Sequence, residues 1–146
     1  MHKMNLWNDS FEAIKDGWKT IEMRLNDEKR SIIKIGDEIE FTNVKTNELL
    51  ICKVTNLFMY KNFDELYNNH NKISIGYKEN EIANPNDMLM YYSKEDIEKY
   101  GVLGIELIKI GGSRLQLVAN DLNILANVLY QNCNLCHLNT QGLLRN

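Results

Sequence analysis

A strand pattern that starts just after a helix-stop glycine is the feature that most constrains how this chain folds. Polar and apolar residues alternate from Thr20 to Leu25, shortly after Gly17. Successive side chains of a strand point to opposite faces, so Thr20, Glu22 and Arg24 share one face and the apolar residues between them share the other. The sequence therefore predicts a short strand with one face in a core and three polar side chains on the other.

Short strand-like and helix-like segments alternate along the first 110 residues. Alternating or β-branched apolar runs predict further strands at about residues 37–42, 49–60 and 102–108. Helical spacing and capping residues predict helices at about 10–16 (capped by Asn8 or Asp9) and 63–69, a helical turn at Asn84-Pro85 and a helix from Ser93 to Gly101. This order predicts an α+β fold, a small mixed β-barrel flanked by short helices, rather than a doubly wound parallel sheet.

Length and charge restrict the class of protein. A chain of 146 residues holds one domain with a proper core and is too short for two ordinary ones. Its net charge of −3 argues against a protein that coats nucleic acid, so any contact with nucleic acid has to be local. Three cysteines, an odd number, favour a reduced, cytoplasmic protein. We find no secretory signal and no apolar run of about 18 residues, and expect no membrane span.

The composition changes at 111–113, a Gly-Gly-Ser step that we interpret as a hinge. Residues 1–110 form the predicted charged domain, and residues 111–146 form a charge-poor tail. Apolar residues recur in the tail with the period of an amphipathic helix: Leu115, Val118, Leu122, Leu125 and Leu129. This C-terminal amphipathic helix could dock on its own domain, or it could recruit a partner, including a second copy of the chain through residues 115–130.

One string in the tail has the spacing of a c-type haem attachment site, Cys133-x-x-Cys136-His137. Because the chain has no export signal, we interpret this string as accidental. The other possible metal ligands are scattered along the sequence: His2, Cys52 and His70. We therefore expect neither a metal site nor a cofactor.

Lys19 directly precedes the polar strand face, and two interpretations of this charged group stay open. In the first the face is solvated, and an ion pair between Glu22 and Arg24 contributes about 0–1 kcal/mol. In the second the group is a site, where Lys19 and Arg24 hold a phosphate or carbonyl oxygen. There the two cations lower the pKa of Glu22, which accepts hydrogen bonds from an amino group. Lys19 could instead lose its charge through desolvation and act as a base.

Two further groups add candidates beside this face. Lys29 and Arg30 belong to a small basic patch, which is either a solvated loop or a contact for a phosphate backbone. Tyr92, near a helix end, either packs in the core or stacks on a base. The catalytic candidates are thus Lys19 and Glu22, and the ligand-binding candidates are Thr20, Arg24, Lys29, Arg30 and Tyr92.

Two blocks in a fixed order carry a resemblance to a known family: G-x-K-T-I-E-x-R over 17–24 and G-D-x-I-x-F over 36–41. An apolar helix segment at 11–14 precedes them, and segments at 63–66 and 100–105 follow them. Over about residues 2–110 the chain resembles the ASCH family, whose fold is a PUA-like β-barrel flanked by helices. The tail after Gly111 has no counterpart in this resemblance.

The resemblance implies a pocket that faces RNA, a nucleotide or a modified nucleoside. One branch of the family consists of small amidohydrolases that remove the acetyl group from N(4)-acetylcytidine. In that branch a lysine that matches Lys19 acts as the base, a threonine three residues later is the nucleophile, and a later glutamate donates a proton. This chain carries Glu22 in place of the nucleophilic threonine, and Glu79 or Glu81 could match the later glutamate.

Three functional hypotheses follow. The first is an ASCH-domain protein that binds RNA or a modified nucleotide or nucleoside through Lys19, Glu22 and Arg24. The second is a small hydrolase that uses the same pocket, either an amidohydrolase of acetylated cytidine or a ribonuclease, with Lys19 as the base and Glu22 orienting water or substrate. The third is a protein-interaction module that acts through the C-terminal helix.

Overall fold

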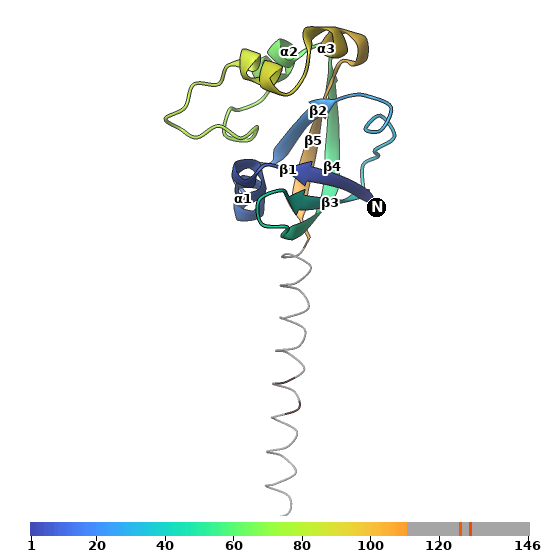
Figure 1. Ribbon diagram of the computed structural model, residues 1–146, viewed down its shortest axis with the longest axis vertical. Coiled ribbons are helices and arrows are strands. Elements are labelled where there is room, and N and C mark those ends of the chain that lie inside the picture. The colour runs from blue at the N-terminus through green and yellow to red at the C-terminus, as the bar shows by residue number, and fades with distance from the viewer. Residues whose placement is uncertain (111–125, 127–128, 130–146) are drawn as a thin grey trace, which may run out of the picture.

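The computed structural model describes residues 1–110, Ala126 and Leu129, and its centre is a five-stranded sheet. The strands are β1 (His2–Leu6), β2 (Ile21–Leu25), β3 (Glu38–Asn43), β4 (Leu49–Tyr60) and β5 (Val102–Lys109). The helices are α1 (Asn8–Asp16), α2 (Phe63–Asn69), the 3-10 helix η1 (Pro85–Met90) and α3 (Lys94–Tyr100). Helix α1 lies beside the sheet, whereas α2 and α3 lie at one end of its strands (Figure 1).

The sheet has the strand order β1-β3-β4-β5-β2 and curves into a half-barrel (Figure 1). β1 pairs in parallel with β3, and all other neighbouring strands are antiparallel. β1 and β2 are therefore the two edge strands of the sheet. This architecture confirms the expected α+β fold, in which a small mixed sheet is flanked by short helices.

Local sequence signals predict α2, α3 and the strands β2 to β5 well, but they miss β1 at the start of the chain. β1 is not among the expected elements, although Met4 and Leu6 alternate with exposed residues as in any half-buried strand. The expected cap of α1 is wrong, because Trp7 occupies the cap position and no side chain caps this helix end. Asn8 instead accepts a hydrogen bond of 3.0 Å from the side chain of Asn43.

Two apolar clusters form the core and divide the sheet between them. One contains side chains of α1, β3 and β4, among them Phe11 and Phe41. The other contains side chains of β2 and α2, among them Met23 and Phe63. Full burial of side chains of this size stabilises the fold by about 1.5–3 kcal/mol each. The apolar side chains of β2 pack in the second cluster, so Glu22 points to the opposite face of the strand.

Several expectations fall outside the described residues. These are the C-terminal amphipathic helix and self-association through residues 115–130, except for the two helical positions Ala126 and Leu129, and the string Cys133-x-x-Cys136-His137. Within the described part of the chain, no helix has both the length and the apolar character needed to cross a membrane.

Candidate functional site

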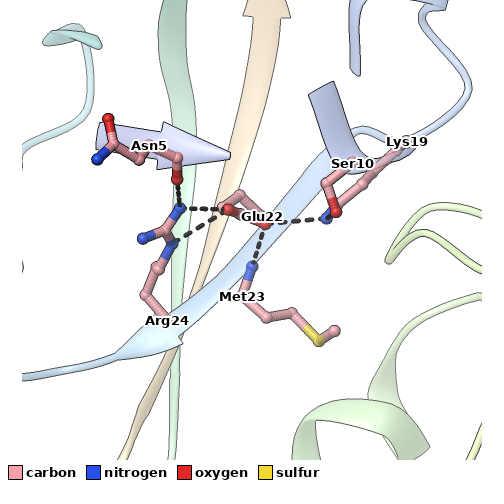
Figure 2. A network of polar contacts seen from close by, with 6 residues as sticks. All are labelled: Asn5, Ser10, Lys19, Glu22, Met23 and Arg24. Carbon is pink, nitrogen blue, oxygen red and sulfur yellow. Dashed lines mark hydrogen bonds and ion pairs between the residues drawn. The ribbon is translucent and has the colours of Figure 1, made fainter. Parts of the chain in front are cut away.

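Lys19, Glu22 and Arg24 form one connected ion network at β2 (Figure 2). The Nζ atom of Lys19 lies 2.9 Å from Oε1 of Glu22. Arg24 donates from Nε and Nη2 to Oε2 of the same carboxylate, at 3.0 and 2.8 Å. The backbone N–H of Met23 donates to Oε1 at 3.2 Å. Each oxygen of Glu22 thus accepts two hydrogen bonds, so this carboxylate is fully used inside the protein.

The end of α1 sets the position of Lys19. Gly17 ends the helix with a φ of 88°, a left-handed value that favours glycine. The chain then turns back, and the Lys19 N–H donates to the carbonyl of Ala13 at 3.2 Å. The Lys19 amine also donates to the hydroxyl of Ser10, on the first turn of α1, at 3.2 Å. The helix stop recognised in the sequence is therefore what brings this amine to Glu22.

The network is buried. Lys19 and Glu22 are each 5% exposed, so the interpretation of a solvated strand face is wrong for both. Burial by itself raises the pKa of the Glu22 carboxyl, but the charges and hydrogen bonds of Lys19 and Arg24 outweigh it and lower that pKa to about 2. Glu22 is therefore ionised at neutral pH, as its two neighbouring cations led us to expect.

Arg24 also connects the two edges of the sheet. Its Nη2 atom donates to the backbone carbonyl of Asn5, on β1, at 2.6 Å, and the same Nη2 atom and Nε also donate to Glu22 on β2 (Figure 2). The Nη1 atom of Arg24 has no hydrogen-bond partner among the described residues (Figure 2). Lys19 likewise uses two of its three N–H donors. The network therefore keeps unused donors on both of its cations.

A cleft of about 580 Å³ lies over this network and provides space for a ligand. Aromatic side chains make up much of its lining: Trp7, Tyr67, Tyr77, Tyr91 and Tyr92. Trp7 and Tyr91 are 66% and 54% exposed, so their rings are accessible. The charged residues of the lining are two cations, Lys19 and Arg24, and three carboxylates, Glu22, Glu81 and Asp87. A cleft with unused donors and open aromatic rings is suited to a flat, polar ligand.

Gly76 lets the loop before η1 approach the Lys19 side chain. A Cβ atom placed on Gly76 would lie 3.1 Å from Cδ of Lys19 and 3.5 Å from its Nζ. The φ of Gly76 is +110°, a value that L side chains rarely adopt. The loop is held there because the backbone N–H groups of Thr20 and Ile21 both donate to the carbonyl of Ser74. Gly76 therefore fixes one side of the space that the lysine occupies.

The structure brings some of the expected site residues together and leaves others apart. Lys19, Glu22, Arg24 and Tyr92 all line the cleft. Thr20, Lys29 and Arg30 are not part of its lining.

The three residues outside the lining have other surroundings. Thr20 joins the loop and the sheet through its backbone, since its carbonyl accepts from the N–H of Leu107. Lys29 is exposed. Arg30 pairs with Asp27 through its guanidinium. Tyr92, by contrast, stacks on Phe63 at 6.0 Å between ring centroids, so it combines a packing contact with a place in the cleft.

Sequence reasoning missed Ser10, Trp7, Tyr67, Tyr77 and Asp87 as cleft residues. Tyr67 lies in the helix expected at 63–69, where the spacing of its apolar neighbours gives no sign of a polar role. The position of Ser10 was partly predictable. It lies on the first turn of α1, and the chain turns back along this helix after Gly17. The loop and η1 residues carry no local pattern that points to β2, and only the tertiary fold brings them there.

No group of three or more metal-ligating side chains occurs among the residues that the structure describes. The Cys52 thiol is buried in the core, and burial raises its pKa to about 12. This thiol is therefore a packing group. The charged and hydroxyl side chains of the cleft are one amine, one guanidinium, the hydroxyls of Ser10 and the tyrosines, and three carboxylates.

Comparisons with known proteins agree with this architecture. The family model described as ASCH domain matches residues 4–111. No protein with curated information matches the chain.

Two solved structures are similar to the chain over most of its length. The crystal structure of hypothetical protein PH0355 is 33% identical, has a TM-score of 0.63, and is matched over 74% of this chain and 97% of its own. The solution NMR structure of protein PF0455 from Pyrococcus furiosus is 32% identical, has a TM-score of 0.60, and is matched over 75% of this chain and 96% of its own.

Proposed function

The chain belongs to the ASCH domain family, and from this premise we propose that it binds RNA or a modified nucleotide or nucleoside in the cleft over Lys19, Glu22 and Arg24. The observation that carries this proposal is the buried ion network with unused donors on both cations. A carbonyl or phosphate oxygen of a nucleotide accepts hydrogen bonds of this kind. The open rings of Trp7 and Tyr91 supply surfaces on which a base can stack.

Within this proposal Glu22 positions the two cations and does not contact the ligand directly. Its four hydrogen bonds leave no free lone pair for an amino group of a base. The expectation that Glu22 itself accepts hydrogen bonds from an amino group of the ligand is therefore not part of this proposal. Glu22 instead holds the Lys19 amine on one carboxylate oxygen and the Arg24 guanidinium on the other, which positions both cations at the cleft.

The two tryptophans of the chain allow a direct test of the cleft. Trp7 lines it and Trp18 does not. We expect ribonucleosides or a short single-stranded RNA to quench tryptophan fluorescence saturably, because a base that stacks near Trp7 contacts its indole ring. The Trp7→Phe variant should lose this quenching, and the Trp18→Phe variant should keep it. Equal quenching in both variants, or no binding of any probe by calorimetry, would contradict the proposal.

A second candidate function, hydrolysis in the same cleft, is favoured by one observation. The hydroxyl of Ser10 lies 3.2 Å from the Lys19 amine, which is the geometry of a serine nucleophile beside a lysine base. Ser10 could thus provide the hydroxyl that Glu22 cannot. In acyl transfer the Ser10 oxygen would form a bond to the acyl carbon, and its proton would pass to a neutral Lys19 amine. The C–N bond of the substrate would break, and the released amine would take that proton. Water would then hydrolyse the acyl ester and restore the Ser10 hydroxyl. The ion pair with Glu22 uses the protonated amine, so hydrolysis requires that pair to open.

Incubation with N(4)-acetylcytidine and with a short RNA, followed by chromatography, tests this second candidate. If it holds, wild type releases cytidine or cleaved RNA, and Ser10→Ala lowers the rate by at least about 100-fold, as expected for loss of a nucleophile. The Thr20→Ala variant is the control, because Thr20 is outside the cleft lining. Binding without any product, or equal rates for wild type and Ser10→Ala, would exclude the serine mechanism and leave binding as the function.

A further inference from the structure

Three side chains of the cleft form a hydrogen-bonded chain that the ion network does not use. The hydroxyl oxygens of Tyr67 and Tyr77 lie 2.8 Å apart. The Tyr77 hydroxyl donates to Oδ2 of Asp87 at 2.8 Å and lies 3.2 Å from the carbonyl oxygen of Asn84. These residues come from α2, the loop after it and η1, whereas the cations come from β2 and the turn before it. All of them except Asn84 line the same cleft.

The partners of Tyr77 fix the direction of this chain. A phenol has one proton to donate, and both the Asp87 carboxylate and the Asn84 carbonyl can only accept. The proton of Tyr77 therefore points to Asp87, so the Tyr67 hydroxyl must donate to the oxygen of Tyr77. Tyr67 has no further proton to offer. Its oxygen presents only lone pairs to the cleft.

Both phenols keep their protons over the physiological pH range, as the direction of the hydrogen-bonded chain requires. Burial raises the pKa of Tyr67, while the hydrogen bond with Tyr77 acts against this to a smaller degree. Burial, followed by the hydrogen bonds to Tyr67 and Asp87, raises the pKa of Tyr77 far above its ordinary value. Both phenols therefore remain hydrogen-bond donors at neutral and mildly alkaline pH.

We infer that Tyr67, ordered by Tyr77 and Asp87, is a specificity-determining acceptor that selects ligands whose base presents an N–H donor to it. The inference rests on the proposed function and adds to it the chemistry of the ligand. Donors on Lys19 and Arg24 meet an oxygen of the ligand, and the acceptor on Tyr67 meets a nitrogen that carries hydrogen. A base with both a carbonyl oxygen and an N–H group satisfies both, while a base alkylated on that nitrogen leaves the Tyr67 oxygen unpaired.

The charges of the lining support a base rather than a phosphate next to this hydrogen-bonded chain. Lys19 and Arg24 are already paired with Glu22, and the other two carboxylates of the lining, Glu81 and Asp87, come from the loop and helix that follow Tyr77. A phosphate dianion placed there would meet like charges, which disfavours it. An uncharged base meets no such penalty and can still accept from the cations and donate to Tyr67.

Calorimetry with matched nucleoside pairs tests this inference. The probes are cytidine with N(4),N(4)-dimethylcytidine and uridine with 3-methyluridine, because both bases carry a carbonyl oxygen and an N–H group. For the nucleoside that binds best, methylation should weaken binding to wild type by about tenfold or more, the effect of one lost hydrogen bond that leaves a buried acceptor unpaired. In Tyr67→Phe the dissociation constants of the methylated and unmethylated nucleosides should differ by no more than about threefold, because the acceptor is gone. The ratio of these constants should also fall in Tyr77→Phe, because the Tyr67 proton is released.

Tyr60→Phe is the matched control, since the Tyr60 hydroxyl bonds to His70 and Tyr60 is not part of the cleft lining. Its ratio should equal that of wild type. Steric exclusion of the methyl group would give the same ratio in all four proteins and would overturn the inference while leaving the proposed function in place. If no nucleoside binds but a short RNA does, the inference about Tyr67 is overturned and the proposed function stays in place. Absence of binding by nucleosides and RNA alike would overturn both.

Discussion

Replacing Glu22 with glutamine is expected to lower the free energy of unfolding by about 3–5 kcal/mol, the usual effect of removing one partner from a buried ion network. Glu22 is 5% exposed and accepts hydrogen bonds from Lys19, Met23 and Arg24. The variant leaves two cations close together without the charge that compensates them. It also weakens the link from β2 to Asn5 on β1, which Arg24 makes only while Glu22 orients its guanidinium. Chemical denaturation followed by circular dichroism measures the loss.

Glu48→Gln is the matched control for this change. Glu48 pairs with Lys15 at 2.8 Å, but both side chains are partly exposed, at 22% and 28%. The same substitution there should cost about 0–1 kcal/mol, because solvent screens the pair and already hydrates both charges. Equal losses at the two positions would mean that the network at β2 contributes no more than a surface ion pair.

Acid should remove the same stabilisation in wild type. The pKa of Glu22 falls from its ordinary value of 4.5 to about 2 on folding, because Lys19 and Arg24 outweigh the effect of burial. Since the folded-state pKa is the lower one, the stabilisation is fully present above pH 4.5 and is lost as the pH falls toward 2. The shift corresponds to about 3 kcal/mol.

Asp37 titrates in the same direction, since hydrogen bonds from His2 and the Lys34 backbone lower its pKa. Glu22→Gln should therefore flatten the acid branch of the stability profile without abolishing its slope. An unchanged acid branch would contradict the assignment of this stabilisation to Glu22.

The elements that sequence predicts well are those whose signals are local. Ser93 accepts a hydrogen bond from the Asp96 N–H, and α3 begins at the next residue, because the cap and the helix are neighbours in the chain. β1 is not predicted because it is a short edge strand in which only Met4 and Leu6 are buried, so its alternation covers just two apolar positions. Its parallel pairing with β3, which joins His2 to Ile39, has no local signal in the sequence.

The same distinction between local signals and tertiary contacts applies to the candidate site. Alternation along β2 placed Glu22 and Arg24 on one face, which the buried network of the structure displays. Alternation could not tell that this face is covered, since the covering comes from the loop near Gly76 and from Tyr77. Thr20 fitted the same pattern but precedes the first residue of the strand, and its backbone is bonded to Ser74 instead. Periodicity thus predicts which side chains share a face, and tertiary contacts decide which of them reach a ligand.

Removing the amine of Lys19 is expected to weaken nucleoside or RNA binding by roughly 10- to 100-fold, the effect of losing one charge-assisted hydrogen bond. Lys19→Met is the suitable variant, because methionine fills the buried space that alanine would leave empty. Lys15→Met is its control, since Lys15 lies on the same helix as Ser10 but is not part of the cleft lining. Calorimetry with the best-binding ribonucleoside measures the change.

Gly76→Ala tests the same amine without removing it. Its new Cβ would lie 3.1 Å from Cδ of Lys19, so the lysine side chain has to shift from the position in which it pairs with Glu22. Gly36 offers the matched control, because its φ of +93° is similarly unfavourable for alanine but no atom lies within 4 Å of the added Cβ. Both variants should lose about 1–3 kcal/mol of stability through backbone strain. Only Gly76→Ala should also weaken binding, because only there does the strained residue press on Lys19. Equal binding by the two variants would show that ligand binding does not depend on the exact position of the Lys19 amine.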